Sequence, residues 1–191
     1  MPKKTTTKFG RNRIRRRINF REPVQKFLII CEGTKTEPNY FNGFKVPKDI
    51  KTIDVRGIGK NTIDLVKEAI IIRKKCDYDQ VWVIFDVDDF PHEFITESLI
   101  MAESNRIRVA CSNRAFEIWY LLHFHFFQTA MTRDQYQQKL SKLLKHPYEK
   151  NSLGIYDELN YLQKNAIKNS KKLVDLYNPH NPAVDNPSTD V

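Results

Sequence analysis

The sequence predicts an α/β fold in which a mostly parallel, four-stranded sheet is flanked by helices and followed by a helical C-terminal part. Short apolar runs of strand length alternate with segments of helical periodicity through residues 27–111. This alternation is typical of parallel strands joined by right-handed crossovers. From residue 116 onward the periodic segments are all helical, so further helices are expected beside the sheet.

A local sequence pattern predicts each of the four strands. The runs 27–31 and 81–86 are continuously apolar, as parallel strands buried on both faces are. Residues 50–58 alternate and end at a Gly-x-Gly break, and a short strand follows at 107–111.

Helical periodicity predicts six helices. Three of them each follow one of the first three strands, and three more come later in the sequence. The first would span 37–44, with Thr36 as its cap and Pro38 tolerated in its first turn. The others are expected at 62–75, 93–104, 116–127, 135–144 and 159–177. Residues 178–191 carry three prolines and are expected to form a surface tail.

The net charge of +9 is concentrated at the N-terminus. Residues 1–21 hold nine Lys or Arg and no acid, which leaves 23 basic and 23 acidic residues in the rest of the chain. We therefore divide the chain into a basic, disordered arm, an α/β core, a helical part and a tail, at 1–23, 24–128, 129–178 and 179–191. The arm either binds nucleic-acid phosphates or serves solubility or targeting. Its candidate contacts are Arg11, Arg13, Arg15, Arg16 and Arg17.

Several protein classes are excluded by composition. The three cysteines lack CxxC spacing, which argues against a disulfide framework or a zinc site. No stretch approaches 18 apolar residues, and no signal-peptide pattern opens the chain. A cytoplasmic protein without a membrane partner is expected.

Acidic residues follow two of the buried strands. Glu32 and Gly33 end the first strand, and Asp86-Val87-Asp88 ends the third. Ligands and catalytic groups collect at the carboxyl ends of strands in open α/β sheets, so these carboxylates are expected to share a pocket. Clustered carboxylates repel one another, and a bound divalent cation relieves the cost. We expect Glu32, Asp86 and Asp88 to hold Mg²⁺ or Mn²⁺, while Asp89 points away.

Other polar residues near the strand ends allow two interpretations each. Lys35 is a candidate phosphate contact at a helix start, and Lys60 is another. Glu37 is either a further acid of the site or a first-turn carboxylate favoured by the helix dipole, and we favour the second. Glu117, inside an apolar helix, either pairs with a base such as Arg114 or joins the metal site.

Ser112 and Asn113 follow the fourth strand and either line the pocket or cap the next helix. His123 and His125 face different sides of a helix, which suits packing or hydrogen bonding rather than shared metal ligation. The neighbouring aromatic cluster, which includes Trp119, is expected in the core.

The motifs together resemble a known family. Glu-Gly after the first strand and Asp-x-Asp after a later one resemble the TOPRIM fold, a Rossmann-type sheet in which the Glu is general acid or base and the Asp pair binds magnesium. The segments 31–41, 85–88 and 112–124, in this order, resemble RloB-like proteins over about residues 24–191. Arg114 stands where that family's Ser-Asn-Pro pattern has a proline, which adds a cation near the site and makes Arg114 a candidate nucleic-acid contact. Residues 186–191 resemble the family's closing motif.

The resemblance implies a magnesium-dependent nuclease of a prokaryotic defence system, acting on DNA or RNA, often beside an AAA-type ATPase partner. Catalytic roles would fall to Glu32, Asp86, Asp88 and Glu117. One alternative is a non-catalytic, nucleic-acid-binding or sensor subunit of such a complex. A haloacid-dehalogenase-like phosphatase is a weaker alternative, because it needs a second acidic pair on later strands.

Overall fold

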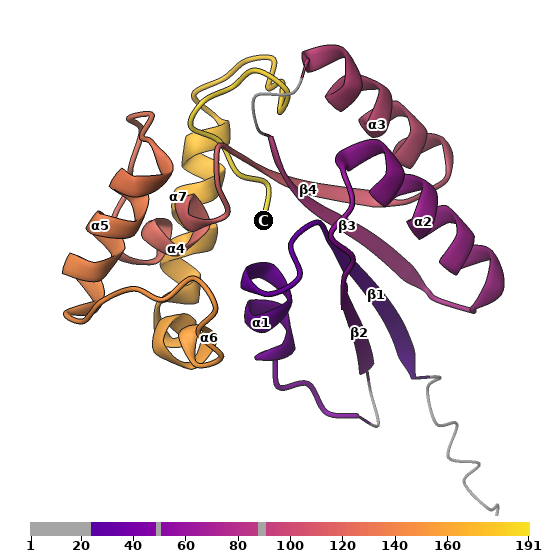
Figure 1. Ribbon diagram of the computed structural model, residues 1–191, viewed down its shortest axis with the longest axis horizontal. Helices are drawn as coiled ribbons and strands as arrows, with labels where there is room; N and C mark the ends of the chain where they lie inside the picture. Colours follow the sequence, from indigo (N-terminus) through magenta and orange to yellow (C-terminus); the bar gives the residue numbers. More distant parts are fainter. Residues whose placement is uncertain (1–23, 49–50, 88–90) are drawn as a thin grey trace, which may run out of the picture.

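A four-stranded, all-parallel sheet forms the centre of the molecule (Figure 1). The computed structural model describes residues 24–48, 51–87 and 91–191, so the arm, Asp88 and Asp89 lie outside the described residues. The strands are β1 (Gln25–Cys31), β2 (Lys51–Gly57), β3 (Gln80–Val87) and β4 (Arg108–Asn113), in the order β2-β1-β3-β4. The predicted fold class is thereby confirmed.

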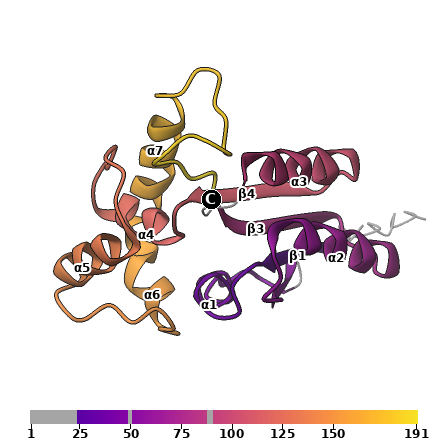
Figure 2. The same ribbon diagram turned by 45° about the horizontal axis from the view of Figure 1, so that its top comes forward.

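Helices cover both faces of the sheet (Figure 2). The crossover helices α2 (Thr62–Lys75) and α3 (His92–Ser104) lie together on one face. On the other side lie α1 (Thr36–Asn42), α4 (Glu117–Phe124), α5 (Arg133–Leu144), α6 (Ile155–Leu159) and α7 (Gln163–Val174). No helix among the described residues is long and apolar enough to cross a membrane.

Strand alternation sorts the core into two clusters. Leu28 and Ile30 of β1 pack with the α2 and α3 side, whereas Cys31 packs with α1 and α4. The same alternation in β3 puts Ile84 on the α4 side. Asp86, two residues further, therefore points toward the side on which α1 and α4 lie.

Two helix predictions were wrong in extent. The helix expected at 116–127 ends at Phe124, after which His125 is extended. The long helix expected at 159–177 is shorter, because a 3₁₀ turn at Asn160–Leu162 separates α6 from α7, which ends at Val174. The break lets α6 turn toward α1, where Tyr156 packs so closely on Gly43 that a Cβ atom there would lie 2.4 Å from its side chain.

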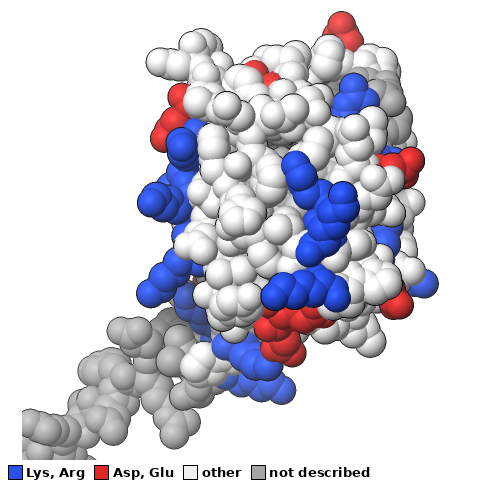
Figure 3. Space-filling model, turned by 90° about the vertical axis from the view of Figure 1, so that its left-hand side faces the viewer, with Lys and Arg blue, Asp and Glu red and all other residues white. Residues whose placement is uncertain are grey.

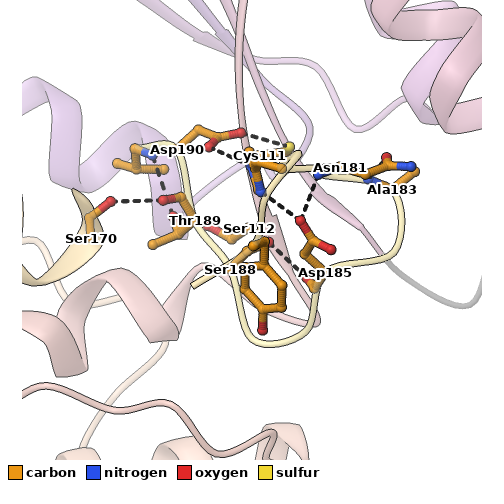
Figure 4. A network of polar contacts seen from close by, with 12 residues as sticks. Cys111, Ser112, Ser170, Asn181, Ala183, Asp185, Ser188, Thr189 and Asp190 are labelled. Atoms are coloured by element: carbon orange, nitrogen blue, oxygen red, sulfur yellow. Dashed lines mark hydrogen bonds and ion pairs between the residues drawn. The ribbon is translucent and has the colours of Figure 1, made fainter. Parts of the chain in front are cut away.

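The C-terminal segment is not the surface tail that its prolines suggested. Thr189 bridges Ser112 of β4 in antiparallel orientation, and the two hydroxyl oxygens are 2.8 Å apart (Figure 4). The backbone of Asn113 donates to Ser188 O, and that of Asp190 donates to Cys111 O. Because Ser188 and Thr189 are buried, this segment is part of the folded core.

Candidate functional site

A pocket of about 260 Å³ opens at the carboxyl edge of the sheet. It lies between the β1–α1 loop, the end of β3, the start of α4 and the loop before α6. Its walls are Glu32, Gly33, Thr34, Lys35, Thr36, Glu37, Asp86, Phe116, Glu117, Lys150 and Asn151. Four of these residues carry carboxylates and two carry ammonium groups. The carboxylates can bind cations, and the ammonium groups can bind phosphates.

Glu32 and Asp86 meet where the adjacent strands β1 and β3 end. The backbone N–H of Asp86 donates to Oε2 of Glu32 at 3.2 Å. The backbone of Glu32 is itself fixed, because its N–H donates to Ile84 O at 2.9 Å and its carbonyl accepts from Gly59 N at 2.8 Å. The structure thus places these two predicted residues side by side in the pocket.

The third predicted ligand, Asp88, lies outside the described residues. Within the part of the chain that is described, no three His, Cys, Asp or Glu side chains are grouped so that they could hold a metal ion. Glu32 and Asp86 offer the hard oxygen donors that Mg²⁺ and Mn²⁺ prefer. These two side chains thus have the right donor atoms for such a cation. The complete set of ligands, with Asp88, stays a prediction.

Glu37 is a buried carboxylate of the pocket, four residues after the glycine of the Glu-Gly motif. Its Oε2 lies 2.2 Å from the position that a Cβ atom on Gly33 would occupy, so a side chain at residue 33 would have to displace this carboxylate. Burial is the main cause that raises the pKa of Glu37, and the nearby charge of Glu117 raises it further. The backbone N–H groups of Glu37 and Gly33 and the Lys150 ammonium act in the opposite direction.

Glu117 is buried in the pocket at the first residue of α4. Tyr148 donates a hydrogen bond to its Oε1 at 3.2 Å. The sequence left open whether Glu117 pairs with Arg114 or joins the metal site. The structure adds Tyr148 as a partner and places Glu117 beside Glu37, within the same acidic pocket.

The loop before α6 contributes groups that sequence reasoning missed. Lys150 and Asn151 line the pocket from it. Thr36 Oγ1 donates to Lys150 O at 3.0 Å, and Asn39 Nδ2 donates to Asn151 O at 2.9 Å, which fixes this loop to α1. These residues lie more than 110 positions apart in sequence, and no local pattern marks them.

Two predicted residues of the site lie elsewhere or differ in role. Lys60 forms an ion pair with Glu68 at 2.7 Å and does not line this pocket. Ser112 does not cap a helix, because α4 begins at Glu117 and the Ser112 hydroxyl forms a hydrogen bond with that of Thr189.

Arg114 adopts a positive φ of 77° in the turn between β4 and α4.

His123 and Trp119 belong to the core, as the sequence predicted. His123 is buried, with Nδ1 at 2.9 Å from Trp119 O and Nε2 at 3.4 Å from the Tyr40 hydroxyl. Burial lowers the pKa of His123 to about 4, so the ring is neutral at pH 7. The aromatic side chains around it pack edge to face and leave no platform for a nucleobase.

The fold and the pocket define an α/β protein whose parallel sheet carries an acidic site at its carboxyl edge. A family model for RloB-like proteins matches residues 27–191, and the chain belongs to this family. A comparison with curated proteins finds no match.

Proposed function

We propose that the protein is a magnesium- or manganese-dependent nuclease that cleaves phosphodiester bonds in nucleic acid. The observation that carries this proposal is the meeting of Glu32 and Asp86, from the carboxyl ends of neighbouring strands, in one pocket with two lysines. Acids at these positions resemble the TOPRIM arrangement, and the ammonium groups of Lys35 and Lys150 suit a phosphate diester.

Each residue has a distinct role in the proposed reaction. Asp86, with Asp88 and one oxygen of Glu32, would hold the cation, which supplies a Lewis acid for water activation and for the leaving oxygen. Glu32 would exchange the proton at the reacting oxygen as general acid or base. Glu117 is oriented by Tyr148 and, with Glu37, keeps the inner wall acidic.

The biological setting rests on the family alone. We propose a role in a cytoplasmic, prokaryotic defence system, with an AAA-type ATPase as partner. DNA and RNA remain equal candidates as substrate. The basic arm would add salt-sensitive affinity for either.

The phosphatase alternative loses support from the topology. A haloacid-dehalogenase-like site needs a second acidic pair on strands after β3. In the described residues only β4 follows β3, and its carboxyl end carries Ser112 and Asn113. A metal-dependent nuclease suits this edge better.

Cleavage of single-stranded RNA, transfer RNA and duplex DNA tests the proposal, with Mg²⁺, with Mn²⁺ and with chelator, and with any neighbouring ATPase added. We expect cation-dependent products from the parent and none from the variant Glu32→Ala/Asp86→Ala/Asp88→Ala. Identical behaviour of parent and variant on every substrate would favour the non-catalytic binding subunit instead.

A further inference from the structure

A second basic surface lies on the helical C-terminal part, and its residues do not line the pocket. Four exposed lysines form it, and we call it the α5–α7 basic face. Its members are Lys139 and Lys142 of α5 and Lys168 and Lys172 of α7. Figure 3 shows the side of the molecule on which α5 lies, where Lys and Arg side chains run down the surface among fewer Asp and Glu.

The turn after α4 joins the two halves of this face. The Lys139 ammonium lies 4.5 Å from the ring centroid of Phe127, and the Lys172 ammonium lies 4.0 Å from that of Phe126. Because these rings are consecutive in sequence, the two lysines flank one turn. The cation–π contacts hold both ammonium groups in place without neutralising them.

Some lysines elsewhere on the molecule are paired with acidic side chains. In the α2 region, Lys60 pairs with Glu68 and Lys67 pairs with Asp64. None of the four lysines of the α5–α7 basic face forms an ion pair with a described residue. Helix α7 contains no acidic residue, and α5 contains Asp134 alone, in its first turn. The positive charge of this face is therefore unbalanced.

Two of these lysines line a surface hollow beside α5. Its volume is about 400 Å³, and Lys139 and Lys142 line it. Its remaining lining mixes polar and apolar side chains, from Thr129, Ala130, Met131, Gln135 and Gln138. Amide side chains beside two ammonium groups suit the phosphate and sugar of a nucleotide, which accept hydrogen bonds.

Helix α4 sets the distance between the face and the pocket. It begins at Glu117 in the pocket and ends at Phe124, just before the aromatic turn. Eight residues of helix span roughly 12 Å. One strand of a duplex covers that length in about three to four nucleotides.

We propose that the α5–α7 basic face binds the phosphate backbone of the nucleic acid whose cleavage we assign to the pocket. The inference rests on the proposed nuclease function for the identity of the ligand. The α5–α7 basic face would recognise the charge of the phosphodiester backbone rather than the base sequence. It would therefore bind single strands and duplexes alike.

Binding by the full chain carrying Glu32→Ala, which prevents cleavage, tests this inference. The test variant adds Lys139→Gln, Lys142→Gln and Lys172→Gln. The matched control adds Lys67→Gln, Lys74→Gln and Lys75→Gln on α2, which gives the same net charge. Lys→Arg at the three test positions serves as the rescue variant, and thermal unfolding checks that each variant is folded.

We expect the test variant to bind a single-stranded RNA of 30 nucleotides or a duplex DNA of 30 base pairs about tenfold more weakly than the control. The slope of log affinity against log salt should fall by about 2 to 3, and the Arg variant should restore it. Equal affinities of test and control variants overturn the inference. If the protein with Glu32 intact cleaves none of the substrates while the test variant still binds more weakly than the control, the nuclease proposal fails and the binding face stands.

Discussion

A carboxylate oxygen of Glu37 lies 2.2 Å from the point at which a Cβ atom on Gly33 would stand. A side chain at the glycine of the Glu-Gly motif would therefore have to displace the Glu37 carboxylate. Backbone freedom is a weaker explanation, since Gly33 is not among the described residues with positive φ.

Gly33→Ala should destabilise the protein by about 1–3 kcal/mol, because the new methyl group must displace the Glu37 carboxylate. Chemical denaturation measures the loss. The double variant Gly33→Ala/Glu37→Ala should recover most of it, since the clash is then absent. Additive losses in the two single variants and the double variant would contradict this cause.

The central carboxylates are expected to be needed for activity and not for folding. Glu32→Ala, Asp86→Ala and Asp88→Ala should each abolish magnesium-dependent cleavage, while the metal-free variants should be as stable as the parent or slightly more so, because repulsion is relieved. Glu32→Gln is the matched control for structure, since it keeps an acceptor for the Asp86 N–H. A large fall in the unfolding temperature of the Ala variants would mean that these carboxylates are structural.

The buried Glu37 gives a pH dependence of stability with a defined sign. Its pKa is raised above the usual 4.5, so the folded protein binds more protons than the unfolded chain between the two pKa values. The stability contributed by this group therefore falls as pH rises through that window. In chelator, Glu37→Gln should match the parent at pH values below 4.5 and be more stable at neutral pH. Urea unfolding across the pH range measures the difference, and parallel curves would rule out this cause.

Lys150 is expected to act on substrate through its ammonium group. Lys150→Gln should weaken substrate binding about tenfold, because a charge-assisted contact to phosphate is lost. The loop should keep its place, since Thr36 holds the Lys150 carbonyl and not its side chain. Lys74→Gln on α2 is the charge-matched control, and an equal effect of both substitutions would show a general charge effect.

Deletion of residues 1–21 should weaken nucleic-acid binding and flatten its salt dependence, because these residues carry nine positive charges and no negative one. The unfolding temperature should stay unchanged. Affinity that is unaltered across a salt series would show that the arm is no electrostatic anchor.

The parts of the fold set by local periodicity were predictable. Helix α2 occupies the predicted residues 62–75, and β1 and β3 lie over the two continuous apolar runs. The carboxyl-edge location of Glu32 and Asp86 followed from the parallel topology. The pairing of Thr189 with Ser112 was missed, because three prolines in the segment suggested a loop and its partner lies 77 residues earlier.

The pocket was predictable only on the side built from strand ends. Lys150 reaches it through a loop whose position depends on hydrogen bonds to α1, and no sequence pattern encodes those bonds. Glu37 was favoured as a helix-dipole carboxylate, which is compatible with its first-turn position. Its burial against Gly33 depends on the β1–α1 turn and needed the structure.

The attachment of the C-terminal segment to β4 bears on the timing of folding during synthesis. A ribosome releases the sheet-forming residues well before residues 186–191, which complete the pairing of Ser112 and Asn113 on the side away from β3. A nascent chain can therefore assemble the sheet while the carboxyl edge of β4 is still incomplete. Such an order would leave the edge beside Asp86, which lies in register with Ser112, incomplete until residues 186–191 have been made. The proposed site would then mature only after these residues are in place.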